Sequence, residues 1–333
     1  MLIECQIAFC LHVFYYVCSC TRCQWFFRRK NFLGHCLTNL SGRQMRVSMK
    51  QPGDIPIVVH TPIWVESDRY SVIENPVCQE IPLDIWVNGA VYATLMRTPG
   101  LERELAVGLC FTDDLITSVE DIQEISCERA DDSASIGKVC LTLPGVRAQD
   151  VNNPSPVKSS SGALTPRQRL DDLRRHSPAA ASQPTFDLAV IPDLPEKLNA
   201  RQVLRSQCGA THGAALFDRH GTCLFCAEDV GRHNGLDKLI GYVLLNHIDP
   251  RDTLLMLSSR ASFEMIQKAA KLAIPVIASV SAPTDLALQA AERLQCTYIS
   301  FLHRRGYFIY THPWRFGLHA DETGQVSHLV VDG

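Results

Sequence analysis

Apolar and polar positions alternate with a period of two through much of residues 56–144, which is the pattern of half-buried strands. Asn88-Gly89 lies between two such runs and is the strongest short signal for a hairpin turn. The expected elements are strands over 56–64, 69–77 and 121–144, a hairpin over 83–95 and a helix over 102–111. We therefore expect 56–144 to form a small, β-rich α+β part.

The second half has a different pattern, in which short apolar runs alternate with amphipathic segments of helical period. This alternation is typical of a layered α/β domain with a largely parallel sheet, and we assign that domain to residues 188–316. The expected strands are 211–217, 222–227, 253–258, 275–280 and 297–302, and the expected helices are 233–247, 261–273 and 284–294.

Three segments follow neither period. Residues 1–48 are rich in Cys and aromatic residues, and their apolar run is too short for the ~20 residues that span a bilayer. We interpret them as an atypical extension without a functional role, with initiation at Met45 or Met49; a membrane or targeting segment is the alternative. Residues 145–187, rich in Ser, Pro and Arg, are expected to form a mobile linker, and residues 317–333 a loose polar tail.

The composition limits the classes of partner that we expect for this protein. The chain has 333 residues, of which 46% are hydrophobic and 20% charged, with a net charge of −3. Such a balance fits a globular protein with no general attraction to nucleic acid or to an anionic membrane. Six of the 14 cysteines fall within the first 36 residues and the others are scattered, which favours reduced thiols and a cytoplasmic location.

Polar turns that open amphipathic runs follow three of the predicted strands, in the segments 228–238, 258–264 and 281–285. Each one joins the carboxyl end of a strand to the N-terminus of a helix, where free backbone N–H groups attract anions. Turns of this kind line the ligand crevice of α/β sheets, so we expect a site for a large anionic molecule. The candidate ligand contacts at these turns are Ser259, Arg260, Ser281 and Thr284. His212 and His233, at predicted strand or helix ends, are further candidates, and an equal alternative for both is a turn residue hydrogen-bonded to the backbone.

Several longer motifs in the same order resemble the formate dehydrogenase accessory sulfurtransferases, the FdhD family. The resemblance covers roughly residues 62–316, apart from the linker. The matching motifs include Val87-Asn-Gly89, Met96-Arg-Thr-Pro-Gly100, Gly209-Ala-Thr-His212, Glu228-Asp-Val-Gly-Arg-His-Asn234, Ser259-Arg-Ala-Ser-Phe-Glu-Met265, Ala278-Ser-Val-Ser-Ala-Pro-Thr-Asp285 and Tyr310-Thr-His-Pro313.

The resemblance implies a C-terminal domain of the cytidine-deaminase-like type and an accessory role in which sulfur passes from a cysteine desulfurase to the molybdenum cofactor of formate dehydrogenase. It also implies that the basic hairpin at 301–306 binds the guanine dinucleotide form of that cofactor; a solvated basic turn is the alternative. The hairpin residues are Phe301, Leu302, His303, Arg304, Arg305 and Gly306.

The sulfur-carrying motif of that family is a Cys-x-x-Cys in the mid-chain loop, and here Ser161 and Leu164 stand at its two cysteine positions. A hydroxyl forms no persulfide, so the motif does not identify the residue that carries the sulfur here. Cys208 is one candidate substitute, and a small residue that fills the turn is the alternative interpretation that we favour for it. Cys223 and Cys226 have the right spacing, but on a regular strand they would point to opposite faces. A misread linker sequence is the third explanation.

A zinc deaminase would need His-x-Glu followed by Pro-Cys-x-x-Cys. Here Gly213 and Ala214 follow His212, and Thr284 and Asp285 follow Pro283. His212, His233, Glu228 and Asp229 are therefore not expected to form a metal centre, and we expect no metal of the protein's own.

Together these features favour an accessory protein that binds the cofactor as cargo and promotes its sulfuration. A non-catalytic cofactor-binding chaperone is the second hypothesis, and a homologue retained for some other contact is the third. Formate dehydrogenase and a cysteine desulfurase are the expected partners, with neither nucleic acid nor membrane among them. A homodimer stays open.

Overall fold

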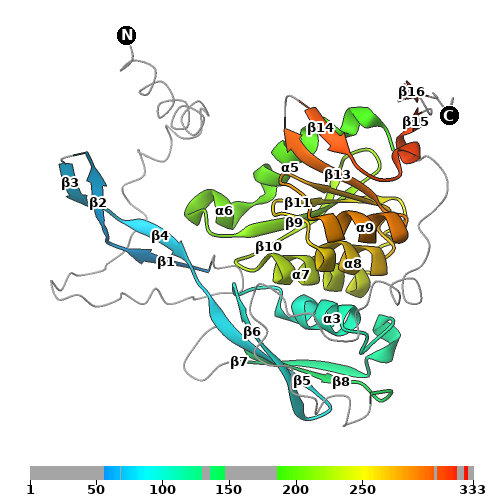
Figure 1. Cartoon of the computed structure of the whole chain (residues 1–333). Coiled ribbons are helices and arrows are strands. Elements are labelled where there is room, and N and C mark those ends of the chain that lie inside the picture. Colours follow the sequence, from blue (N-terminus) through cyan, green and yellow to red (C-terminus); the bar gives the residue numbers. More distant parts are fainter. Residues whose placement is uncertain are drawn as a thin grey trace. The chain divides into compact units, whose positions relative to one another are not determined.

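The computed structural model describes residues 56–67, 69–129, 136–146, 186–303, 306–320 and 326–328 (Figure 1). The described ranges all belong to one compact unit, residues 45–333. The predicted extension at 1–48 and almost all of the predicted linker, including Ser161 and Leu164, lie outside the described residues.

The first described segment is a pair of short two-stranded ribbons. The sequence predicted one strand over 56–64 and another over 69–77, and each of these is divided in two. The strands are β1 (Ile57–His60), β2 (Ile63–Glu66), β3 (Arg69–Val72) and β4 (Asn75–Cys78). Both pairings, β1 with β4 and β2 with β3, are antiparallel.

A four-stranded sheet follows, in the order β6-β5-β8-β7. The predicted hairpin is confirmed: Asn88 and Gly89 both have positive φ angles, 50° and 81°, as the tight turn between two right-twisted strands requires. Strands β5 and β8 are parallel, and the other two pairings are antiparallel. The strands are β5 (Ile81–Val87), β6 (Ala90–Arg97), β7 (Glu124–Arg129) and β8 (Ile136–Thr142).

The C-terminal part is built on a six-stranded sheet in the order β10-β9-β11-β12-β13-β14. The prediction of a largely parallel sheet is only partly right, because parallel pairing is confined to β11-β12-β13 and the remaining three pairings are antiparallel. The strands are β9 (His212–Asp218), β10 (Cys223–Asp229), β11 (Thr253–Leu257), β12 (Val276–Ser279), β13 (Thr297–His303) and β14 (Gly306–Ile309).

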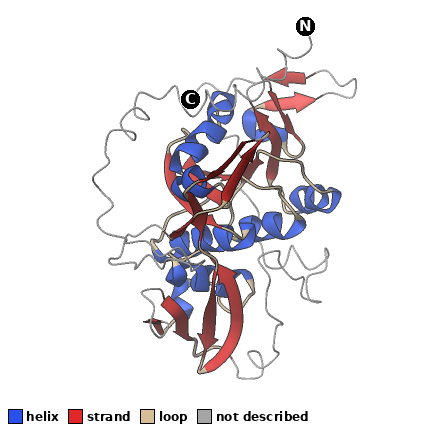
Figure 2. Ribbon diagram, turned by 90° about the vertical axis from the view of Figure 1, so that its left-hand side faces the viewer, coloured by secondary structure: helices blue, strands red, loops and turns tan. Residues whose placement is uncertain are grey.

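Helices cover both faces of this sheet (Figure 2). On one face α7, α8 and α9 share a core with α3 and the four-stranded sheet, so the two parts of the chain are joined by one hydrophobic core. On the other face α5 and a short 3-10 helix at Leu188–Asp193 pack with Phe316. The helices are α3 (Glu102–Thr112), α5 (Leu194–Arg201), α6 (Val203–Cys208), α7 (Arg232–Leu245), α8 (Phe263–Lys271) and α9 (Asp285–Arg293).

Two glycines set the crossing of α3 and α7. A Cβ placed on Gly108 would lie 1.9 Å from the backbone oxygen of Asp237, and one on Gly241 would lie 1.8 Å from the backbone oxygen of Glu104. Each glycine thus admits the backbone of the opposite helix, and any side chain at either position would force the helices apart.

The end of the chain departs from the prediction of a loose tail. Strand β15 (Leu318–Ala320) pairs antiparallel with β16 (Val326–His328), after a 3-10 helix at Pro313–Phe316. Among the described residues, no helix combines the length and the apolar character needed to cross a membrane.

Candidate functional site

The three predicted turns lie on one edge of the six-stranded sheet. Strands β10, β11, β12 and β13 all end at this edge. Strands β11, β12 and β13 are parallel, and β10 has the same direction because β9, which lies between β10 and β11, is antiparallel to both. Direct contacts tie the turns together: Val280 N donates to Leu257 O at 3.2 Å, and Gly213 N donates to Ser258 Oγ at 2.8 Å. We call this the carboxyl edge of the sheet.

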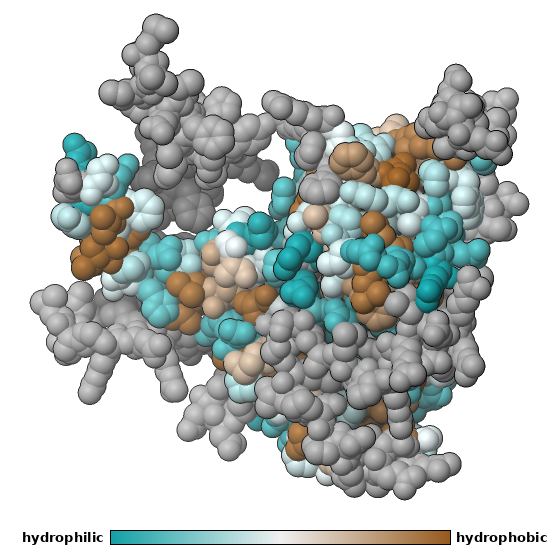
Figure 3. Space-filling model, viewed as in Figure 1, coloured by the Kyte–Doolittle hydropathy of each residue, from teal (hydrophilic) through white to brown (hydrophobic). Residues whose placement is uncertain are grey.

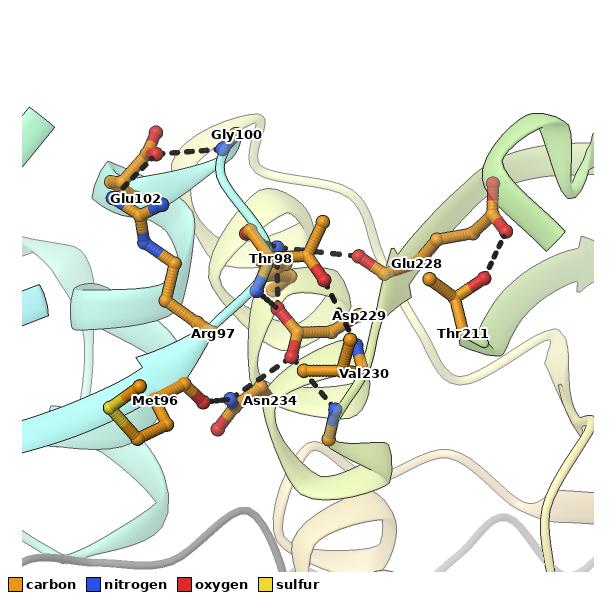
Figure 4. Close-up of polar contacts among 12 residues, drawn as sticks. Met96, Arg97, Thr98, Gly100, Glu102, Thr211, Glu228, Asp229, Val230 and Asn234 are labelled. Carbon is orange, nitrogen blue, oxygen red and sulfur yellow. Dashed lines mark hydrogen bonds and ion pairs between the residues drawn. The ribbon is translucent and has the colours of Figure 1, made fainter. Parts of the chain in front are cut away.

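Asp229, the last residue of β10, organises one end of this edge (Figure 4). Its carboxylate accepts hydrogen bonds from the backbone N–H groups of Thr98 at 3.1 Å and Gly231 at 2.9 Å, and from Asn234 Nδ2 at 3.1 Å. It also forms a 2.7 Å ion pair with Lys238, and both side chains are buried. A buried carboxylate with this many donors is held as a structural anion.

Thr98 joins the N-terminal part of the chain to this network. It directly follows β6, and its hydroxyl accepts a hydrogen bond from Val230 N at 3.1 Å, while its carbonyl accepts one from Lys238 Nζ at 2.8 Å. Close by, Arg97 is fully buried and pairs with Glu102 at 3.1 Å. No local pattern in the sequence pointed to Thr98 or Lys238 as site residues, although Thr98 lies within one of the family motifs.

Glu228 holds the short helix α6 against the start of β9. One carboxylate oxygen accepts from Leu204 N, and the other accepts from Arg205 N and from Thr211 Oγ1, each at 2.8 Å. The acidic side chain thus satisfies the free N–H groups at the beginning of α6. As a result, Cys208, at the end of α6, lies beside the carboxyl edge.

His212 opens β9 and is half-buried. Burial lowers its pKa, and the nearby guanidinium groups of Arg205 and Arg232 lower it further. Its Nδ1 is buried and has no hydrogen-bond partner among the described residues. A neutral imidazole between two arginines marks a locally positive environment, which suits an anionic ligand.

His233 lies at a helix end, as the sequence predicted, because α7 begins at Arg232. It is buried in the first turn of α7, and its Nε2 lies 3.5 Å from Glu264 Oε2 on α8. This contact is the main cause that lowers the pKa of Glu264 to about 2. In this structure His233 connects two helices.

The remaining predicted turn residues differ in exposure. Ser259 is buried and donates to Arg260 O at 3.1 Å, whereas the Arg260 side chain is exposed. Thr284 caps α9 by accepting from Ala287 N at 3.2 Å. The carbonyl of Ser281 accepts from Ser300 Oγ at 2.9 Å, which fixes the third turn against β13.

The predicted basic hairpin leaves the sheet from this same edge, because β13 ends at His303 and β14 begins at Gly306. Gly306 has a φ of 145°, a conformation that only glycine adopts easily. The Leu302 side chain is buried in the core cluster that includes residues of α5. Arg304 and Arg305 lie outside the described residues, as do the side chains of Phe301 and His303.

The prediction for Cys223 and Cys226 is wrong. A β-bulge lies between Cys223 and Phe225, so that Cys223 pairs with Phe217 and Cys226 with Ala215. Both cysteines therefore pack against the same core face. Burial raises the pKa of Cys226 to about 12, and Cys223 adds to this rise. Cys223 begins β10 and Cys226 lies at its middle, so both precede the carboxyl edge at Asp229.

A cysteine that the sequence analysis did not consider lies next to Thr98. Cys78 ends β4, and its Sγ is 3.4 Å from Thr98 Oγ1. Burial raises its pKa to about 11 against the lowering effect of this hydrogen bond, and the nearby Cys208 thiol raises it further. Nothing in the sequence spacing pointed to the pair of Cys78 and Cys208, since these two residues are 130 positions apart.

Several comparisons place the chain among known proteins. Sulfur carrier protein FdhD of Xanthomonas euvesicatoria is 32% identical over 284 residues, which are 85% of this chain and 97% of the relative. The protein of the same name from Mycolicibacterium paratuberculosis is 38% identical over 247 residues, covering 72% of this chain and 90% of the relative.

Among solved structures, a crystal structure from Desulfotalea psychrophila described as a formate dehydrogenase accessory protein has a TM-score of 0.62. It is 22% identical and covers 78% of this chain and 98% of the other, so it shows the shared mixed α/β fold. The profile of the FdhD/NarQ family matches residues 78–317. This chain belongs to the FdhD/NarQ family.

Proposed function

We propose that this protein binds the guanine dinucleotide form of the molybdenum cofactor and promotes its sulfuration for formate dehydrogenase, with a cysteine desulfurase as the sulfur source. The names of the relatives, sulfur carrier proteins and a formate dehydrogenase accessory protein, support this direction. We also propose a cytoplasmic location, which the scattered cysteines of the main body favour.

The observation that carries the proposal is the meeting of cation-rich and N–H-rich segments at the carboxyl edge. The N-termini of α7, α8 and α9 follow the ends of β10, β11 and β12 at this edge, and His212 lies there with Arg205 and Arg232 around it. The segment with Arg304 and Arg305 connects two strands at this edge. Helix N-termini and arginines together favour phosphate groups.

The strand order supports a layering of the cytidine-deaminase-like type for the C-terminal part. Counting from β9 as the first strand, the order across β10-β9-β11-β12-β13 is 2-1-3-4-5, with the first strand antiparallel to its neighbours. In such a sheet, strand ends and helix N-termini form the ligand edge. The deaminase chemistry itself is not part of this proposal, since the required motifs are missing from the sequence.

Binding of guanine nucleotides tests the proposal. GDP should bind the full chain in calorimetry, and the affinity should fall with added salt. Replacing Arg304 and Arg305 together with Ala removes charge-assisted hydrogen bonds of about 1.5–3 kcal/mol each. One lost contact of that size lowers the affinity at least about tenfold.

The exposed pair Arg219 and His220, in the turn between β9 and β10, provides the matched control. Its double Ala variant removes comparable groups at the other end of the strands and should bind GDP as the parent does. If the Arg304/Arg305 variant binds GDP like the parent, or the control loses as much, the hairpin is not the nucleotide site.

We also propose a homodimer. Both strands of the β2–β3 ribbon are exposed along their length, and the side chains include large apolar groups (Figure 3). An exposed apolar ribbon with unpaired edges favours association with another chain, and a second copy brings an identical ribbon to it. The most exposed of these side chains are Ile63, Trp64, Val65, Tyr70 and Val72.

A further inference from the structure

Several pairs of cysteines lie on one element or on two elements that contact each other in the part of the chain that the structure describes. Cys127 and Cys140 lie on the paired strands β7 and β8, and Cys223 and Cys226 share one face of β10. The third pair is Cys78 and Cys208, which meet where β4 packs against α6. Among these pairs, the third alone lies beside the carboxyl edge, where the proposed ligand would bind.

We propose that Cys78 and Cys208 form the sulfur-carrying thiol pair of this protein, in place of the cysteines that are replaced by Ser161 and Leu164. The inference rests on the proposed function and names the residues that would carry it out. Both thiols are half-buried, so neither is sealed inside the core.

The positions of the two thiols are fixed by the network around Asp229. Thr98 contacts Cys78 through its hydroxyl and is itself held by Val230 N and Lys238. Cys208 donates to Leu204 O at 3.0 Å, and Leu204 N is held by Glu228. Glu228 and Asp229 are consecutive at the end of β10. The end of this one strand therefore holds both Cys78 and Cys208 beside the carboxyl edge, through Thr98 and Leu204 respectively.

The environments of the thiols assign different roles. Burial raises the pKa of Cys78 to about 11, which leaves almost no thiolate at neutral pH, and thiolates are the attacking species. Cys208 ends α6, in which no residue is buried, whereas the Cys78 thiol lies against Thr98. A donor protein therefore reaches Cys208 more readily, and we assign it as the sulfur acceptor. Its thiolate attacks the outer sulfur of a protein-bound persulfide, the donor's S–S bond breaks, and the donor leaves as a thiolate that takes up a proton. Cys208 now carries the persulfide, with no net oxidation.

Cys78 acts second. As its proton passes to the terminal sulfur of the persulfide, Cys78 Sγ attacks Sγ of Cys208; a Cys78–Cys208 disulfide forms, the bond to the terminal sulfur breaks, and hydrosulfide leaves toward the ligand. The two thiols are oxidised by two electrons and the transferred sulfur is reduced by two. A dithiol reductant restores the pair for another cycle.

The test uses the full chain, a cysteine desulfurase and L-cysteine without oxygen, followed by alkylation and mass spectrometry of peptides. A mass gain of about 32 Da should map to Cys208. It should be absent from Cys208→Ser, and it should persist in the double control Cys223→Ser/Cys226→Ser. In Cys78→Ser the persulfide should still form and should survive at least about tenfold longer, because the resolving thiol is missing.

A second measurement does not depend on the desulfurase. Treatment of the parent protein with diamide, followed by non-reducing peptide mapping, should give a Cys78–Cys208 disulfide, which Cys78→Ser cannot form. Circular dichroism and GDP binding show whether each variant is folded. If Cys208→Ser is unfolded, the persulfide measurement uses Cys208→Ala instead, and the diamide-induced Cys78–Cys208 disulfide of the parent protein provides the second readout.

The outcomes separate the two proposals. A persulfide on another cysteine overturns the role of this pair and leaves the sulfur-carrying function intact. A parent protein that binds GDP but forms no persulfide overturns the pair and favours the non-catalytic chaperone. If the parent protein does not bind GDP, the proposed function is overturned, whichever cysteine carries the persulfide.

Discussion

The carboxylate of Asp229 and the ammonium group of Lys238 form an ion pair of 2.7 Å between β10 and α7, with 0% and 1% of the two side chains exposed. The same two side chains also bind Thr98, which belongs to the N-terminal part of the chain. One buried pair therefore joins three segments distant in sequence, and its loss should affect both stability and the carboxyl edge.

We expect Asp229→Asn to lower the free energy of unfolding by about 3–5 kcal/mol, because it leaves the buried ammonium of Lys238 without its counter-charge. Urea denaturation followed by circular dichroism measures this loss. Asp249→Asn is the matched control: Asp249 pairs with Arg251 at 2.6 Å, but both side chains are largely exposed, and such pairs contribute about 0–1 kcal/mol. Equal effects of the two variants would contradict the structural role of Asp229.

The contact of α3 with α7 should be equally sensitive to volume. We expect Gly108→Ala to destabilise the fold by about 1–3 kcal/mol, because the added methyl group overlaps the backbone of Asp237. Gly145→Ala is the control, since a Cβ there meets nothing within 4 Å. Thermal unfolding of both variants tests the crossing. A Gly108→Ala protein as stable as the parent would show that the helices are not held this close.

Stability should depend on pH through Glu264, whose pKa is lowered to about 2 by His233. Because the folded-state pKa lies below the ordinary value of 4.5, the ionised carboxylate stabilises the folded state above about pH 4.5. That contribution is lost as the pH falls from 4.5 toward 2. The difference in unfolding free energy between the parent and Glu264→Gln should therefore shrink over this range. A difference that is constant with pH would rule out the proposed pairing.

The β2–β3 ribbon gives a prediction for assembly. Trp64 and Tyr70 are 50% and 72% exposed, and replacing both with Ser removes apolar area from the ribbon without touching a core cluster. In sedimentation velocity, the parent should show a concentration-dependent mass between monomer and dimer, and the double variant should remain a monomer. Leu286→Ser, another exposed apolar position but on α9, should behave as the parent. If the ribbon variant dimerises normally, the interface lies elsewhere.

Local sequence determined the elements that depend on local forces. The hairpin at Asn88-Gly89 was predictable because few residue pairs tolerate two positive φ angles. The three strand-to-helix turns were predictable because the apolar period changes there. The helices α5 and α6 were missed, as was the bulge in β10 that brings Cys223 and Cys226 to one face. A bulge depends on how a strand fits its partner, which no period reveals.

The arrangement of the site was decided by tertiary structure. The residue types of the carboxyl edge were visible in the sequence, because strand ends and helix N-termini have a local signature. The meeting of Thr98 with Asp229 and of Cys78 with Cys208 was not, since each pair is separated by 130 residues or so and meets only when α3 packs on α7 and β4 on α6. Spacing along the chain sets chemistry within one element, whereas burial of the shared core determines which distant side chains become neighbours.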